Sequence, residues 1–213
     1  MNNFVVTTFW TDHPYRNYRG AAEALGKSCE AQGIRCIVKE RPQLEIHEHE
    51  AIWAMKGPLI QEVMDETGLP VWWADADSLL IDGARLAKDT AELVERRIDL
   101  AYHMFETNKA PVAVSRYGAA LHWPAMGSCF FNNTEKGREV IVHWEEMHQQ
   151  FLTEDDQMTM ERATKATCGI TWRNMPPEYY QMYDDKRYVD RTPVFKQMQL
   201  RRNPGYLNQE NEK

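Results

Sequence analysis

Two aspartates, Asp75 and Asp77, are the residues of this sequence whose type and spacing could do chemistry. They follow residues 71–74, an apolar and β-prone run that predicts a buried strand. Carboxylates at the end of a buried strand are costly unless a cation compensates their charge. Mg²⁺ and Mn²⁺ prefer oxygen ligands, and they usually bind one or two carboxylates together with substrate phosphates. Alternate residues of a strand point the same way, so we expect one ion to meet both carboxylates.

A solvated turn between two strands is the alternative interpretation of the aspartate pair. The choice depends on the elements around it. Residues 4–8 and 34–38 predict strands, and apolar residues at helical spacing between them predict a connecting helix. Because a strand, a helix and a strand follow one another within about forty residues, we expect a βαβ unit and a parallel sheet.

The rest of the chain continues the alternation of helices and strands that is typical of an α/β domain. Residues 86–97 predict a surface helix, and residues 99–104 and 112–115 predict strands. Residues 135–151 predict a helix whose buried stripe contains Val140, Trp144, Met147 and Phe151.

Composition limits the class of protein. The chain has 213 residues, of which 43% are hydrophobic, enough for one large domain or two small ones. Its net charge of −7 disfavours a surface that is generally coated with nucleic acid, although a local basic patch remains compatible with it. No apolar run has membrane length and the first residues do not form a signal peptide, so we expect a cytoplasmic protein without membrane insertion. The four cysteines contain no CxxC pair, which favours reduced thiols over structural zinc.

Residues 71–81, VWWADADSLLI, resemble the Asp-x-Asp motif of nucleotide-sugar glycosyltransferases with the A-type fold. In that family the motif closes a central strand and holds Mn²⁺ against the donor diphosphate. The resemblance extends in order over residues 4–202. It implies a single Rossmann-like domain, residues 1–202, with a mainly parallel central sheet flanked by helices. Residues 1–82 would form the nucleotide-binding half, residues 83–202 the sugar and acceptor half, and residues 203–213 a flexible tail.

The same resemblance implies donor-binding residues in three further segments. The end of the first strand, Thr7, Thr8 and Phe9, would contact the base and ribose. Lys56 precedes a helix with Pro58 in its first turn, where related enzymes carry a cation that could face the diphosphate. Gly127 and Ser128 belong to PAMGSCFFNNT, which resembles the segment that lines the donor sugar and acceptor. A plain loop, a surface lysine and a buried strand are the respective structural alternatives.

Asp155, Asp156 and Gln157 resemble an Asp-Gln pair that opens a helix in the family, where its acid reaches the donor sugar or the acceptor hydroxyl. An inverting enzyme needs a carboxylate base for that hydroxyl, and Asp156 or Asp155 is the candidate. Gln157 would bind the donor. The alternative is structural, because Thr153 followed at the third position by Asp156 resembles a capping box.

The end of the chain differs in charge from the rest. Residues 186–202 contain six basic residues and one acid. They resemble a family segment with a Pro-Val strand, a metal-binding histidine and basic residues over the diphosphate. The histidine is absent here, with Lys196 or Gln197 in its place, so the third protein ligand of the metal is left open. Lys196 and Arg202 are the expected diphosphate contacts.

These features predict a glycosyltransferase that moves a hexose or pentose from a nucleotide-diphosphate sugar to an acceptor hydroxyl. The cofactor would be Mn²⁺ or Mg²⁺ on Asp75 and Asp77. The acceptor would be a glycan sugar or a hydroxymethylated DNA base. The alternative is a sugar-nucleotide nucleotidyltransferase or another metal-dependent nucleotide-binding enzyme, although the expected Gly-rich basic loop is replaced by TFWTDHPYRN.

Overall fold

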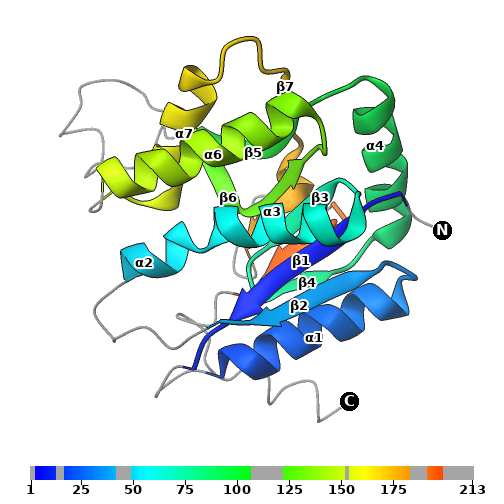
Figure 1. Cartoon of the computed structure of the whole chain (residues 1–213). Helices are drawn as coiled ribbons and strands as arrows, with labels where there is room; N and C mark the ends of the chain where they lie inside the picture. The colour runs from blue at the N-terminus through cyan, green and yellow to red at the C-terminus, as the bar shows by residue number, and fades with distance from the viewer. Residues whose placement is uncertain are drawn as a thin grey trace.

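The computed structural model describes residues 3–12, 17–41, 49–106, 122–151, 154–182 and 191–198. Its central sheet has six strands in the order β2-β1-β3-β6-β5-β7 (Figure 1). In chain order they are β1 Val5–Trp10, β2 Cys36–Glu40, β3 Val71–Ala74, β5 Leu100–Glu106, β6 His122–Phe131 and β7 Trp172–Met175. Only β6 among these six strands runs against its neighbours, so the predicted mainly parallel sheet is confirmed.

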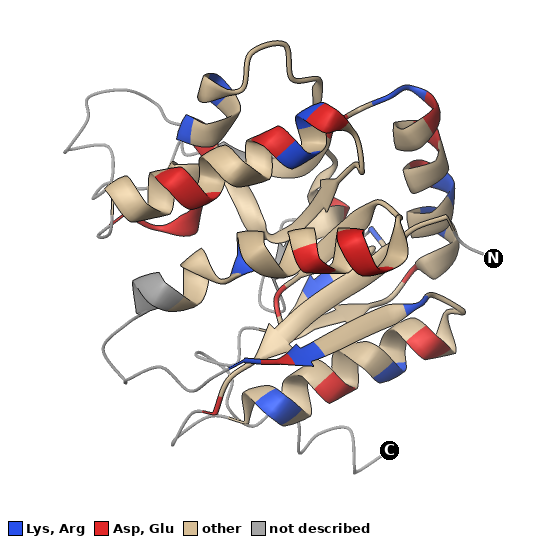
Figure 2. Ribbon diagram, in the orientation of Figure 1, with Lys and Arg blue, Asp and Glu red and all other residues tan. Residues whose placement is uncertain are grey.

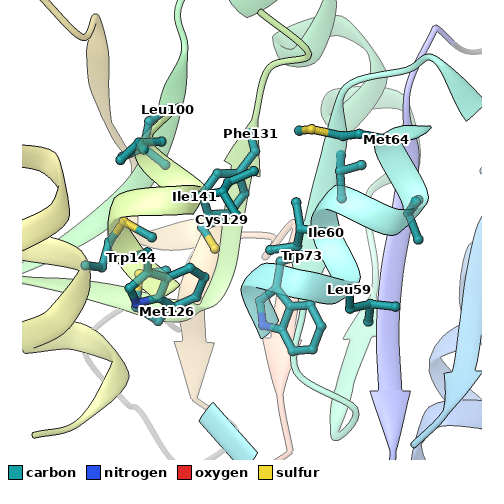
Figure 3. Close-up of a cluster of buried hydrophobic side chains, with 14 of the residues drawn as sticks. Leu59, Ile60, Met64, Trp73, Leu100, Met126, Cys129, Phe131, Ile141 and Trp144 are labelled. Atoms are coloured by element: carbon teal, nitrogen blue, oxygen red, sulfur yellow. The ribbon is translucent and has the colours of Figure 1, made fainter. Parts of the chain in front are cut away.

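Helices cover both faces of this sheet. They are α1 Tyr18–Ala31, α2 His49–Ala54, α3 Lys56–Thr67, α4 Gly83–Glu95, α6 Glu135–Gln150 and α7 Asp156–Ala166. Strand β3 shows why two layers are needed, because Trp72 and Trp73 point to opposite faces and both are buried. Trp73 packs with α3, α6 and α7 in the core of Figure 3, whereas Trp72 packs with α1 and α4.

A second sheet of three strands lies beside the central one. It has the order β4-β9-β8 and consists of β4 Ser78–Leu80, β9 Phe195–Gln197 and β8 Gln181–Met182. A short 3₁₀ helix, η1 Pro177–Tyr180, connects β7 with β8. Strands β3 and β4 follow one another directly, so the segment between them, which carries both aspartates, is a tight turn.

Most predicted elements are confirmed, with differences at their ends. Strands β1 and β2 are parallel, as expected for a βαβ unit. Strand β1 continues two residues beyond the predicted end, to Trp10. Trp144 is completely buried, as its helical stripe predicted, and its indole donates a hydrogen bond of 3.0 Å to Thr159 Oγ1. The strand predicted at residues 112–115 lies outside the described residues. No helix within the described segments combines the length and apolar character needed to cross a membrane.

The predicted capping box before α7 is wrong. Asp155 is the N-cap residue, and its Oδ1 accepts hydrogen bonds from the backbone N–H groups of Gln157 and Met158, at 3.1 and 2.9 Å. The helix therefore begins at Asp156, whose side chain is not needed as a cap. Thr153 lies outside the described residues.

Candidate active site

Asp75 and Asp77 lie in the turn between β3 and β4. The turn is closed by a hydrogen bond of 2.9 Å from the Ser78 backbone N–H to the Asp75 carbonyl oxygen. It is also held from outside, because Asp75 N–H donates to the Gly127 carbonyl and Met198 N–H donates to the Asp77 carbonyl, both at 2.8 Å. The prediction that both carboxylates extend from one strand is therefore wrong. Both residues lie in a turn that β6 and the end of β9 support, and both line the same cavity.

Lys56, the first residue of α3, meets this turn from the side. Its residue is 5% exposed, and its Nζ lies 2.9 Å from Asp75 Oδ1 and 2.5 Å from Asp156 Oδ2. The ammonium also lies 5.3 Å from the centroid of the Trp73 ring. Burial lowers the pKa of Lys56, but the charges of Asp156 and Asp75 outweigh burial and hold this pKa well above its ordinary value. The lysine is therefore a permanent buried cation that two carboxylates share.

The two oxygens of Asp75 have different surroundings. Oδ1 accepts hydrogen bonds from Lys56 Nζ and, at 3.0 Å, from Trp73 Nε1. Oδ2 accepts no hydrogen bond from a described residue, and it faces Gly127. A Cβ at Gly127 would lie 2.9 Å from Asp75 Oδ2 and 2.3 Å from Cε2 of Tyr180. The tyrosine ring and this carboxylate oxygen therefore fill the volume that a side chain at position 127 would need, so glycine is required there.

Tyr180 is a site residue that sequence reasoning missed. It comes from η1, and burial together with the charges of Asp75 and Asp156 raises the pKa of its phenol. No local pattern marks it, because its place depends on how the chain returns from β7 to the centre of the molecule.

Asp156 and Asp155 have separate functions in the structure. Asp155 caps α7, and its pKa is raised mainly by burial. Asp156 is 8% exposed, and its Oδ2 accepts a hydrogen bond from Lys56. It therefore belongs to the site although it lies one hundred positions after Lys56 in the sequence. The backbone N–H of Gln157 donates to Oδ1 of the cap residue Asp155. Its predicted donor contact stays a prediction.

A cavity of about 190 Å³ opens beside Lys56 and the aspartate turn. Aromatic residues line much of it. Its wall consists of Phe9, Trp10 and Thr11 from the end of β1, Tyr18, Ile52 and Trp53 from α1 and α2, and Lys56, Trp73, Asp75, Ala76 and Asp77. Of the three predicted base and ribose contacts, Phe9 lines this cavity. A ligand in this cavity would meet the longer end of β1 rather than Thr7 or Thr8.

Thr7, Thr8 and Ser128 are completely buried in the sheet. The Thr7 hydroxyl donates to the Ile37 carbonyl at 2.9 Å. Ser128 is paired with Ala74 and, by strand alternation, points to the face opposite its neighbour Cys129, away from Trp73. The structure therefore places these three side chains inside the fold and not on the cavity wall.

Strand β9 supports the turn that carries Asp75 and Asp77 through the side chain of Gln197. Gln197 is completely buried, donates to the Gly127 carbonyl at 3.2 Å and accepts from Ser78 Oγ at 2.7 Å. Its side-chain oxygen is thus engaged within the protein. Lys196 is half-buried and, as the neighbouring residue of a strand, points to the other side. Its contact with a diphosphate stays a prediction, and Arg202 lies outside the described residues.

The donor set around the turn fits a hard divalent cation. Within the described residues, no group of three or more His, Cys, Asp or Glu side chains is placed to share an ion. Mg²⁺ and Mn²⁺ need only one or two carboxylates when substrate phosphates complete the coordination. The Asp75 side chain is 34% exposed, and Asp75 and Asp77 line the same cavity from one turn. We expect these two residues to hold the ion if one binds.

Comparisons with known proteins concern the fold. No protein-family model and no curated protein matches the sequence. A glycosyltransferase involved in the glycosylation of the major capsid of PBCV-1 has a similar structure, with a TM-score of 0.69 at 13% identity. The match covers 97% of this chain and 98% of that chain. The fold is that of the A-type glycosyltransferases.

A second solved structure agrees with this assignment. An active-site mutant of the galactosyltransferase LgtC matches with a TM-score of 0.50 at 13% identity, over 91% of this chain and 86% of that chain. The fold expected from the Asp-x-Asp resemblance is therefore confirmed over nearly the whole chain.

Proposed function

We propose that this protein is a glycosyltransferase that moves a sugar from a nucleotide-diphosphate donor to an acceptor hydroxyl. One observation carries the proposal: Lys56, Asp75 and Asp156 meet in an ion-paired cluster beside an aromatic-lined cavity, at the carboxyl end of β3. Ligands of open α/β sheets bind beyond the carboxyl ends of strands. The A-type fold supports the same reading.

The cavity suits the nucleoside part of such a donor. Phe9 and Trp73 lie with ring centroids 5.5 Å apart, and Trp10 and Trp53 add further aromatic surface. A nucleobase can stack on aromatic rings whatever its hydrogen-bonding edge. The diphosphate would then lie toward Asp75 and Asp77, where bound Mn²⁺ or Mg²⁺ would neutralise charge that develops on the leaving group. Lys196 and Arg202 would add positive charge near the diphosphate.

Asp156 is the better of the two candidate bases. Asp155 is committed to the cap of α7, whereas Asp156 has only Oδ2 engaged by Lys56 among the described contacts. Its other oxygen can accept the proton of an acceptor hydroxyl or orient the donor sugar. Lys56 fixes the position of this carboxylate and of Asp75 at the same time.

The acceptor is a glycan hydroxyl or a hydroxymethylated DNA base, and the net charge of −7 favours the uncharged glycan. Salt distinguishes the two acceptors, because binding of a polyanion weakens steeply as salt increases. A nucleotidyltransferase remains the second candidate activity, and it would release pyrophosphate from a nucleoside triphosphate.

A panel of nucleotide sugars, tested for thermal stabilisation with and without Mn²⁺, provides the first test. We expect one donor class to raise the melting temperature in a Mn²⁺-dependent way and to support sugar transfer. Asp75→Asn should abolish transfer. Asp65 is an exposed acid of α3 that pairs with Arg138 of α6, so Asp65→Asn is a matched control that should not abolish transfer. Full transfer by Asp75→Asn, or stabilisation by nucleoside triphosphates alone with pyrophosphate release, would contradict the proposal.

A further inference from the structure

The Asp75 carboxylate would bind two cations: the Lys56 ammonium, which it already contacts, and the divalent ion of the proposed function. Its Oδ1 is 2.9 Å from the Lys56 ammonium, whereas its Oδ2 accepts no hydrogen bond from a described residue and the side chain, 34% exposed, lines the cavity. The ammonium cannot leave for solvent without breaking a second contact, because Asp156 Oδ2 holds it at 2.5 Å and the residue is buried. A divalent ion at Oδ2 must therefore share one carboxylate with a fixed positive charge.

We propose that Lys56 is a built-in cation that makes divalent metal binding at Asp75 conditional on the phosphates of the donor. The inference rests on the metal-dependent form of the proposed function. It concerns the regulation of that site and not the identity of the donor.

The physical reason is repulsion inside a partly dry site. Like charges a few ångströms apart repel more strongly where water is excluded, so the ammonium weakens binding of the ion to Asp75. Asp156 offsets part of this repulsion although it need not touch the ion. Donor phosphates supply new anionic ligands, so metal and donor raise each other's affinity by the same factor. The apo protein then binds the ion weakly, and the metal enters together with the donor.

Mn²⁺ binding measured by electron paramagnetic resonance of the free ion tests this without any activity assay. Lys56→Gln removes the ammonium and should bind Mn²⁺ alone about ten-fold tighter or more than the wild-type protein. Asp156→Asn leaves the ammonium less compensated and should bind Mn²⁺ several-fold more weakly. Lys56→Arg keeps the charge and should behave like the wild type. Lys39→Gln, which removes a half-buried lysine shared by Glu62 and Glu66, is the matched control and should change nothing.

A second titration adds uridine, guanosine or cytidine diphosphate. The diphosphate that binds should increase Mn²⁺ affinity by a larger factor in the wild type than in Lys56→Gln. Circular dichroism melting shows that each variant is folded at the temperature of the titration.

Two outcomes overturn the inference in distinguishable ways. If the wild type binds Mn²⁺ but Lys56→Gln binds it equally or more weakly, Lys56 does not compete with the ion and only this inference fails. If no variant binds Mn²⁺ with or without a diphosphate, the metal-dependent form of the proposed function fails with it.

Discussion

Two lysines of this protein each share their ammonium between two carboxylates. Lys56 contacts Asp75 and Asp156 at 2.9 and 2.5 Å, and Lys39 on β2 contacts Glu62 and Glu66 of α3 at 3.1 and 2.6 Å. The distances are similar, but the Lys56 side chain is 6% exposed and the Lys39 side chain 26%. Figure 2 shows the acidic bands along α3, where the partners of Lys39 lie.

The difference between these lysines is one of surroundings rather than of contacts. Water and salt screen the Lys39 pairs, so we expect them to contribute little to stability. Lys56 joins acids from β3 and α7, and removal of the cation would leave carboxylates in a site that water reaches poorly. Similar pairs therefore contribute little at the surface, whereas around Lys56 they hold together the charged residues of the candidate active site.

The largest expected effect is that of Lys56→Met. It should lower the free energy of unfolding by about 3–5 kcal/mol, at the lower end of this range because Asp75 is partly exposed. It should also remove sugar transfer. Urea denaturation and a transfer assay check both outcomes, and a loss below 1 kcal/mol would mean that burial does not distinguish Lys56 from Lys39.

The double variant Lys56→Met with Asp156→Leu tests whether the unpaired carboxylate of Asp156 causes the loss of stability. Apolar replacement of a whole buried pair is often close to neutral, whereas removal of one partner is not. We expect the double variant to recover about 1–3 kcal/mol relative to Lys56→Met while transfer stays absent. Urea denaturation of both variants measures the recovery, and equal stability would argue that the uncompensated Asp156 is not the source of the loss.

His148 of α6 shows how the charge of Lys56 affects the pH dependence of stability. Burial and the charge of Lys56 lower its pKa from 6.5 to about 4, so the native protein keeps this histidine neutral. The unfolded chain then binds more protons, and stability should fall as the pH decreases from 6.5 toward 4. The loss attributable to His148 between pH 6.5 and pH 5 should be on the order of 1–2 kcal/mol.

Denaturation of the wild type and of His148→Gln across this range tests the assignment. The variant should show a shallower decrease of stability with falling pH. Identical slopes would mean that another group titrates. His148 lies 3.2 Å from Thr159 Oγ1 through Nε2, so a glutamine can retain a polar contact there.

Lys39→Met should have the smallest effect. We expect a loss of at most about 1 kcal/mol, because the pairs are partly exposed. The loss should shrink further in 0.5 M NaCl, roughly a salt level at which exposed pairs are strongly screened. A salt-independent loss of several kcal/mol would remove the contrast with Lys56.

The sequence was sufficient for those parts of the fold that depend on local pattern. The βαβ unit, the buried stripe around Trp144 and the buried strand before Asp75 follow from periodicity, whereas the turn that carries the two aspartates was only the alternative interpretation. The ends of elements were less predictable, since the exact start of α7 decides whether Asp155 or Asp156 caps it. Tyr180 could not be found at all, and Gln197 was placed only by its resemblance to the family's histidine position, because only the return of the chain brings both residues to Gly127.

The last described strand has a consequence for the order in which the protein matures. Gln197 accepts a hydrogen bond from Ser78, which lies 119 positions earlier in the chain. Met198, the residue after β9, donates its backbone N–H to the Asp77 carbonyl. Contacts of such long range form only after the cost of closing a large loop has been met. A nascent chain that still lacks β9 has the aspartates but not the frame that holds them. The site is therefore completed only once β9 has been synthesised, later than most of the core residues.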